Sequence, residues 1–270
     1  MNSTPEKAER DRATRYVLTR RLDRMFISLS ANYRFIARFF REVFVPPYEW
    51  RAIINQCYEV GFRSLPLITL TGFIIGIVFT NQSRPSLSDL GATALLPALV
   101  AVAVVRALAP LVTALIAAGR VGSNIGAELG SMKVTEQIDA MEVSAINPFK
   151  YLVVSRIVAC TLMMPTLMMY MMLVALLGSY VNVHQNELTT FRSFFDQVFE
   201  TISFLDLFSS IIKSFIFGFT IGVVGCYQGY NSSKGTEGVG KAANASVVAS
   251  MFLIFIEELL ALQVINAFRV

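Results

Sequence analysis

The chain has 270 residues, of which 54% are hydrophobic and only 16% are charged. A soluble domain normally carries about 25% charged residues, so this composition argues against an ordinary soluble protein and favours several membrane-spanning helices. The three cysteines, Cys57, Cys160 and Cys226, are scattered along the chain and predict neither a disulfide framework nor a metal site.

Positive charge is concentrated near the N-terminus. Twelve of the 23 Lys and Arg residues fall in Met1–Arg63, whereas the net charge of the whole chain is only +4. Basic segments beside membrane spans are retained in the cytoplasm, so this bias predicts a cytoplasmic N-terminus. Seven acidic residues are interleaved in the same segment and the remaining chain is apolar, which argues against nucleic acid as a partner. No signal peptide is predicted, because the N-terminus has no short apolar core followed by a cleavage site.

The first 63 residues divide into a polar tail and an amphipathic segment. Residues 1–31 are charged and poor in apolar side chains, so we expect a cytoplasmic tail. Residues 32–63 place aromatic side chains such as Phe39 on one helical face and arginines such as Arg38 on the other, and Trp50 can anchor at headgroup level. This pattern predicts helices that lie in the membrane interface. The alternative is an amphipathic helix packed on a protein core.

Residues 64–270 are predicted to form a transmembrane domain. Five apolar runs are long enough to cross a bilayer, and they cover residues 64–80, 92–118, 152–180, 206–228 and 242–268. With a cytoplasmic N-terminus, five spans place the C-terminus and the polar loops 81–89 and 181–205 on the outer side. The expected fold class is an all-α integral membrane protein, with an N-terminal interfacial amphipathic helix followed by about five transmembrane helices.

A loop of unusual composition, residues 119–150, separates the second and third predicted spans. It begins with closely spaced glycines and continues into a short polar-apolar segment, Thr135–Val143, which is predicted to be helical. Thr135 can cap this helix, and Glu136 in the first turn suits the positive end of its dipole. Ile138 lies on its apolar face, opposite the carboxylates. A short surface helix between two spans is suited to docking a soluble partner.

This central loop also carries a resemblance to a known family. GRVGSNIGAELGSMKVTEQIDAMEV, at Gly119–Val143, resembles the signature of the MlaE (YrbE) permeases, the membrane subunits of MCE-type bacterial lipid-trafficking ABC transporters. Shorter matching motifs are QCYEVGFRSL (Gln56–Leu65), VRALAP (Val105–Pro110), IIKS (Ile211–Ser214) and QGY (Gln228–Tyr230). The resemblance extends from about residue 35 to the end of the chain.

The resemblance implies a multi-pass protein of the bacterial inner (cytoplasmic) membrane that forms a homodimer around an apolar cavity. It implies two further partners, a cytoplasmic ABC ATPase and a periplasmic MCE-domain protein, and in some relatives a STAS-domain protein. The chain would move phospholipid or a similar lipid between the membrane and the MCE protein, in support of outer-membrane lipid asymmetry. It would not be an enzyme and would hold no cofactor, because ATP and magnesium would be bound by the partner ATPase.

The same resemblance makes the Thr135–Val143 helix a cytoplasmic coupling helix seated on the ATPase. The residues expected to take part in coupling are Arg120, Glu128, Thr135, Glu136, Gln137, Asp139 and Met141.

Four charged residues inside the predicted spans form a second candidate site, a charge belt near the lipid cavity: Arg106, Lys213, Glu257 and Glu258. A charge at the bilayer centre costs about 2.5–3.5 kcal/mol on insertion scales, so each should face a partner or a wet cavity. At a rise of about 1.5 Å per residue, Arg106, Lys213 and Glu257 fall at one depth in the outer half of the bilayer. We therefore predict an Arg106–Glu257 ion pair, with Lys213 beside it or beside Glu258. The belt serves either transport or helix register.

One position departs from the family. The family usually has Glu after the arginine, whereas Ala107 follows Arg106 here, so no role of that acid is carried over. GTEGVGK, at Gly235–Lys241, has the spacing of a phosphate-binding loop, but Ala242 stands where Ser or Thr would bind magnesium, so nucleotide binding is not predicted.

The methionines of the third span, from Met163 to Met172, either pack against neighbouring helices and lipid or line a flexible path for acyl chains. An intramembrane enzyme is disfavoured, because no nucleophile or metal motif is visible. The remaining alternative is an ion-coupled secondary transporter of a hydrophobic substrate, with Glu257 or Glu258 as its proton site.

Overall fold

The computed structural model describes residues 30–46, 48–187, 189–233 and 235–268. The chain divides into two units at Pro47–Tyr48. In the described part of the first unit, residues 30–43 form one helix, on which Arg38 and Glu42 make an i,i+4 ion pair of 4.0 Å. Its position in the membrane interface stays a prediction, and residues 1–29 of the expected tail lie outside the described residues.

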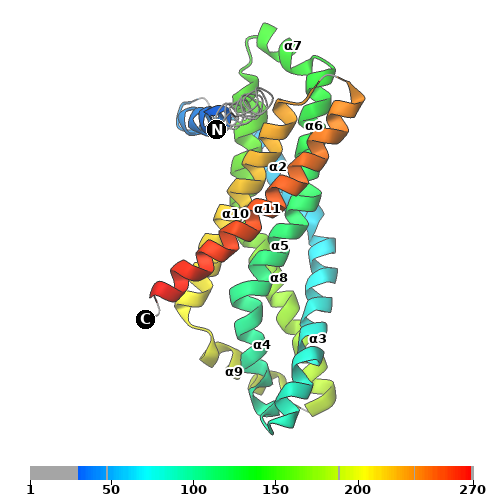
Figure 1. Cartoon of the computed structure of the whole chain (residues 1–270), viewed down its shortest axis with the longest axis vertical. Coiled ribbons are helices and arrows are strands. Elements are labelled where there is room, and N and C mark those ends of the chain that lie inside the picture. Colours follow the sequence, from blue (N-terminus) through cyan, green and yellow to red (C-terminus); the bar gives the residue numbers. More distant parts are fainter. Residues whose placement is uncertain (1–29, 47, 188, 234, 269–270) are drawn as a thin grey trace, which may run out of the picture. The chain divides into compact units, whose positions relative to one another are not determined.

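In the second unit, five helical segments of the described chain are long and apolar enough to cross a membrane (Figure 1). They are Trp50–Asp89, Thr93–Val134, Phe149–Glu187, Phe204–Tyr230 and Thr236–Ile265. The described residues form helices and connecting turns without a strand. The expected fold class, an all-α membrane protein with five spans, is confirmed.

The first span consists of α2 (Trp50–Val60), the 3-10 turn η1 (Phe62–Ser64) and α3 (Leu65–Asp89). Residues 81–89 were expected to be a loop, but they continue α3. The helix extends because its polar end is bonded to the third span: Arg84 Nη2 lies 2.8 Å from Asn182 Oδ1, and Arg84 Nε lies 3.4 Å from Glu187 Oε1. Polarity at 81–89 therefore marks a half-buried polar contact with the third span, not a chain reversal.

The second span is one continuous helix with two π turns. In chain order it contains η2 (Thr93–Leu95), α4 (Leu96–Ala103), the π turn η3 (Val104–Leu108), α5 (Ala109–Ala117), the π turn η4 (Ala118–Gly122) and α6 (Ser123–Val134). The predicted loop 119–150 is therefore helical up to Val134, which corrects its expected start.

The glycines of α6 are helical because they pack closely against another helix. A Cβ on Gly126 would lie only 3.0 Å from the backbone oxygen of Ala242 and 3.2 Å from Cα of Ala243, both in α11 (Thr236–Phe268). Ser246 Oγ of α11 also donates to the carbonyl of Gly122 at 2.8 Å. Close backbone packing between small residues compensates for the low helix propensity of glycine.

The predicted short helix is present as α7 (Gln137–Val143), but its expected N-cap is wrong. The Thr135 hydroxyl donates to the backbone oxygen of Ser131 and so closes α6. Glu136 precedes α7 in the left-handed conformation, with φ of +58°, and its side chain makes no capping bond. The chain therefore needs a sharp corner at Thr135–Glu136, and this corner takes the place of a regular cap.

The remaining elements are the π turn η5 (Phe149–Val154), α8 (Ser155–Glu187), α9 (Phe191–Thr201) and α10 (Phe204–Tyr230), followed by α11. The expected outer loop 181–205 is thus largely helical, and Thr190 caps α9 by accepting the N–H of Ser193 at 3.3 Å. Most of the GTEGVGK segment forms the start of α11, which begins at Thr236, and the element before it is the helix α10 and not a strand.

Helix α8 is the centre of the bundle, in contact with α3 on one side and α10 on the other. Gly76 of α3 faces the backbone of Ala175 so tightly that a Cβ would overlap it. Met164, Met168 and Met171 are fully buried in the packing around α8. For these three methionines, the structure favours core packing.

Candidate functional site

An ion pair joins the π turn η3 to the start of α10. Arg106 Nη2 lies 2.9 Å from Asp206 Oδ2, and the Asp206 side chain is only 2% exposed. Asp206 Oδ2 also accepts the backbone N–H of Ser203 at 3.2 Å, as part of a capping box that begins α10. The predicted Arg106–Glu257 pair is therefore wrong. Asp206 binds Arg106 instead, because the helix start holds its carboxylate beside the π turn.

Lys213 makes the second ion pair of this network. Its Nζ lies 2.8 Å and 3.1 Å from the two carboxylate oxygens of Glu258, and it also donates to the backbone oxygen of Arg106 at 2.7 Å. Ser210 Oγ donates to the neighbouring carbonyl of Val105 at 2.8 Å. A π turn interrupts the regular hydrogen-bond pattern of an α-helix. Here, two backbone carbonyls of η3 accept hydrogen bonds from side chains of α10.

Three of the four predicted belt residues are thus connected: Arg106, Lys213 and Glu258. The suggested proximity of Lys213 to Glu258 is confirmed. Glu257 lies apart from both ion pairs, and its Oε1 accepts a hydrogen bond from the Thr220 hydroxyl. Its Oε2 is buried and has no hydrogen-bond partner among the described residues. The fourth belt residue therefore has a different environment from the other three.

An apolar cavity of about 610 Å³ opens between α10 and α11 beside this network. Lys213 and Glu257 are the charged residues of its lining, and the walls are otherwise almost entirely apolar. Six of the wall residues are Leu205, Phe208, Ile212, Ile216, Leu260 and Val264. Small-molecule sites have volumes of roughly 300–1,000 Å³ with few polar groups. The arrangement is suited to a hydrophobic chain that has a polar group near one end.

The α6–α7 corner gathers five of the predicted coupling residues at one end of the bundle, hereafter the α7 end (Figure 1). They are Thr135, Glu136, Gln137, Asp139 and Met141. Ile138 anchors α7 with a side chain that is 1% exposed. Lys133 Nζ lies 3.4 Å from Asp139 Oδ1. The sequence did not single out Val143, an apolar side chain that is 90% exposed and extends the apolar surface available to a partner.

The other two predicted coupling residues, Arg120 and Glu128, do not join this group. Arg120 donates to Ser64 Oγ and, at 3.4 Å, to the backbone oxygen of Glu59, so it ties η4 to the first span. Glu128 Oε1 lies 2.8 Å from Arg156 Nη2 of α8. Sequence reasoning missed Arg156, although its charge lies within a predicted span and its side chain is only 3% exposed. It also missed Asp206, whose signal was the Ser-x-x-Asp capping pattern.

Comparison with known proteins agrees with this architecture. A family described as Permease MlaE matches residues 53–264. A probable ABC transporter permease protein of Rickettsia typhi is 34% identical over 240 residues, which cover 88% of this chain and 92% of the relative. One of Synechocystis is 35% identical over 208 residues, which cover 77% and 79% of the two chains.

A further relative is the chloroplastic protein Trigalactosyldiacylglycerol 1 of Arabidopsis thaliana, 32% identical over 209 residues that cover 77% of this chain and 60% of the relative. The family match covers most of the chain and includes nearly all of the five candidate spans. The chain therefore belongs to the MlaE permease family, and it is a non-catalytic transmembrane component of an ABC transporter.

Proposed function

We propose that this permease moves phospholipid or a similar lipid between the bacterial inner membrane and a periplasmic MCE-domain protein. The observation that carries the proposal is the cavity of about 610 Å³ between α10 and α11, whose walls are apolar except near Lys213 and Glu257. Acyl chains match such walls because they are desolvated by apolar contact alone. The name of the Arabidopsis relative, which contains a glycolipid, gives further support to a lipid substrate.

An ABC transporter permease works with an ATPase, and we place that partner at α7. The surface of α7 combines exposed Glu136 and Asp139 with the exposed apolar side chain of Val143. Charged residues around an apolar centre are typical of a protein interface. ATP and magnesium would be bound by the ATPase, and a STAS-domain protein would act on the ATPase where one is present. With the α7 end in the cytoplasm, the N-terminus is cytoplasmic and the MCE protein lies at the opposite end.

A homodimer is part of the proposal. Helices α3 and α11 leave most of their apolar surface uncovered, with Leu70, Val78, Val248 and Phe252 all more than half exposed. Helix α8, by contrast, is largely buried. A second copy placed against α3 or α11 would enclose apolar space between the two chains, while the rest of this surface would face lipid.

The proposed mechanism follows the continuous second span. Movement of α7 on ATP binding would be carried through α6 to η3, where Arg106 is paired with Asp206. Because Lys213 is bonded to both Arg106 and Glu258, a shift of η3 would displace α10 relative to α11. That displacement would change the width of the cavity between them and so expel or admit a lipid.

The test is lipid transfer in proteoliposomes that contain the permease, its co-purified ATPase and a headgroup-labelled phospholipid. We expect transfer to an added MCE-domain protein that requires ATP and survives a proton ionophore. Transfer without the ATPase that collapses with the ionophore would establish the alternative, an ion-coupled secondary transporter. The buried Oε2 of Glu257, which has no hydrogen-bond partner in the described part of the chain, is the feature that would serve such a transporter.

A further inference from the structure

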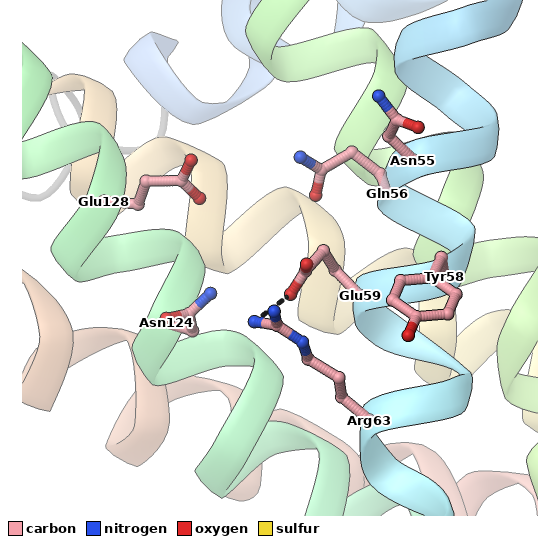
Figure 2. Close-up of a pocket in the computed structure, with 7 residues that line it drawn as sticks. All are labelled: Asn55, Gln56, Tyr58, Glu59, Arg63, Asn124 and Glu128. Carbon is pink, nitrogen blue, oxygen red and sulfur yellow. Dashed lines mark ion pairs between the residues drawn. The ribbon is translucent and has the colours of Figure 1, made fainter.

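A polar crevice of about 480 Å³ separates the first span from α6 near the α7 end. Figure 2 shows Gln56, Glu59 and Arg63 extending from the first span toward α6, where Asn124 and Glu128 face them. A smaller hollow of about 120 Å³ continues along the same walls as far as Arg120. The crevice is distinct from the apolar cavity and uses a different pair of helices.

Two regularly spaced rows of polar residues form the walls. Gln56, Glu59 and Arg63 lie three or four residues apart on the first span, and Asn124 and Glu128 lie four apart on α6, so each row shares one helix face. Both helices belong to candidate membrane spans. Polar side chains on a spanning helix are costly when they face lipid tails. The rows must therefore face water or a polar ligand.

The charged residues of the crevice lining are Arg63 and Glu59 on the first span and Glu128 on the opposite wall. Arg63 Nη1 lies 2.7 Å from Glu59 Oε2, yet the Arg63 side chain is 59% exposed, so part of its guanidinium faces the crevice. On the opposite wall, buried Arg156 holds one oxygen of Glu128 while 45% of the Glu128 side chain stays exposed. A guanidinium is well matched to phosphate oxygens, and a carboxylate is matched to an ammonium group.

An exposed apolar row runs beside the crevice. Ile54, Tyr58 and Phe62 lie four residues apart on the first span and are each more than half exposed, and the rings of Tyr58 and Phe62 stack at 5.1 Å. Tyr58 belongs both to this row and to the rim of the crevice. A ligand that occupies both surfaces would be amphiphilic, with a zwitterionic head and an apolar body.

We propose that the crevice binds the zwitterionic headgroup of a membrane phospholipid, with its phosphate at Arg63, its ammonium group at Glu128 and its chains along Ile54–Phe62. This inference rests on the proposed function and adds a second lipid contact to it, in the leaflet on the α7 side. A water-soluble glycerophosphodiester carries the same polar chemistry, but it would leave the apolar row uncovered.

The test uses the permease–ATPase complex in nanodiscs that contain phosphatidylethanolamine with a photoreactive group on its headgroup. We expect cross-links to peptides that contain residues 55–63 and 124–128. Arg63→Gln and Asn124→Leu should each lower this labelling at least about fivefold, whereas Arg192→Gln, an exposed arginine of α9, should leave it unchanged. Glu128→Gln should reduce the preference for phosphatidylethanolamine over phosphatidylglycerol of matched chains. Free glycerophosphoethanolamine at the lipid's concentration should not compete.

Three outcomes would overturn the proposal. Labelling confined to other helices, while ATP-dependent lipid transfer continues, would remove the crevice site and leave the proposed function standing. Equal competition by free glycerophosphoethanolamine would assign the crevice to a soluble phosphodiester. Loss of labelling in Arg192→Gln as well would mean that the effect is not local. Absence of both lipid labelling and lipid transfer would instead remove the proposed function itself.

Discussion

Lys213 shows how a single charged side chain can be accommodated inside a membrane span. Its ammonium group has three N–H donors, and it has three acceptors: both carboxylate oxygens of Glu258 and the backbone oxygen of Arg106. The side chain is only 4% exposed, so water cannot replace a missing partner. The contribution of Glu258 should therefore be measurable as stability.

Replacing Glu258 tests this pairing. Glu258→Met leaves Lys213 buried with one acceptor, and removing one partner of a buried ion pair typically costs about 3–5 kcal/mol. We expect a clear drop in the melting temperature of the detergent-solubilised protein, measured by fluorescence-detected gel filtration after heating. The double variant Lys213→Met/Glu258→Met should recover most of the loss, since no unpaired charge remains. A double variant as unstable as the single one would contradict this assignment.

Replacing Glu257 should affect lipid transfer and not stability, in contrast to the replacement of Glu258. It makes one hydrogen bond, from Thr220, and lines the apolar cavity outside both ion pairs. Glu257→Gln keeps an acceptor for Thr220 and should leave the melting temperature unchanged, but it removes one of the two charges of the cavity and should lower lipid transfer several-fold. Thr220→Val removes only the hydrogen bond and serves as the matched control. Equal transfer by Glu257→Gln and the unmodified chain would exclude Glu257 from the lipid path.

The limits of sequence reasoning are visible in these same residues. Depth along a helix axis follows from residue counting, and it placed Arg106 and Lys213 at one level, as their contact shows. Partner choice also depends on rotation about the axis. Each residue contributes about 100° of rotation, and the π turn at Arg106 shifts that phase without a sequence signal. Asp206, rather than Glu257, therefore faces the guanidinium.

At the scale of whole elements, hydropathy located the core of each span but not its ends. Residues 81–89 and 119–134 are polar or rich in glycine, which predicts loops, yet both are helical. Their side chains find partners on neighbouring helices, as Arg84 does on α8 and Gly126 does on α11. Such tertiary contacts involve residues about 100 positions apart, and no local pattern reveals them.

The close contact between α6 and α11 predicts that two glycine-to-alanine substitutions change the stability of the protein in opposite directions. Gly126→Ala places a methyl group 3.0 Å from the Ala242 carbonyl and should lower stability, because backbone atoms cannot move aside easily. Gly240→Ala has open space around it within the same helix pair and should raise stability by about 0.5–1 kcal/mol, the helix cost of glycine. Melting temperatures of the two variants, measured side by side, check both. Two changes of the same sign would contradict the packing described here.

At the scale of the whole molecule, one helical segment connects the proposed ATPase surface to the charge network. Thr93–Val134 leads into α7 at one end and carries Arg106 in the half farther from α7. Between them, Arg120 and Glu128 are bonded to the first and third spans. The contacts of Arg120 with the first span and of Glu128 with the third span connect the second span to its neighbours. Movement of α7 should therefore reach the first and third spans as well as the cavity.

Native mass spectrometry of the complex tests this arrangement and its partners. We expect two copies of the chain with two ATPase subunits. Glu136→Arg/Asp139→Arg reverses the charge of two exposed residues at the start of α7 and should release the ATPase while the two permease copies remain together. Glu237→Arg/Lys241→Glu, an exposed pair outside α7, is the matched control and should release nothing. A single permease copy in the unmodified complex would refute the homodimer.

The two π turns of the second span also constrain how its length can change. A π turn accommodates one residue more than an α-helical turn, so deleting one residue from Val104–Leu108 would restore a regular helix and preserve its hydrophobicity. Helices α6 and α7 would keep their phase, because the residues of a π turn cover about the same rotation as one residue fewer in an α-helix. Deleting one residue from the regular helix α5 would instead rotate everything beyond it by about 100° relative to α4. After the deletion in α5, Arg120 would lose Ser64 and Glu128 would lose Arg156, although every one of these residues would still be present. Transplanting α6 and α7 into another permease therefore requires a match of helical phase as well as of sequence.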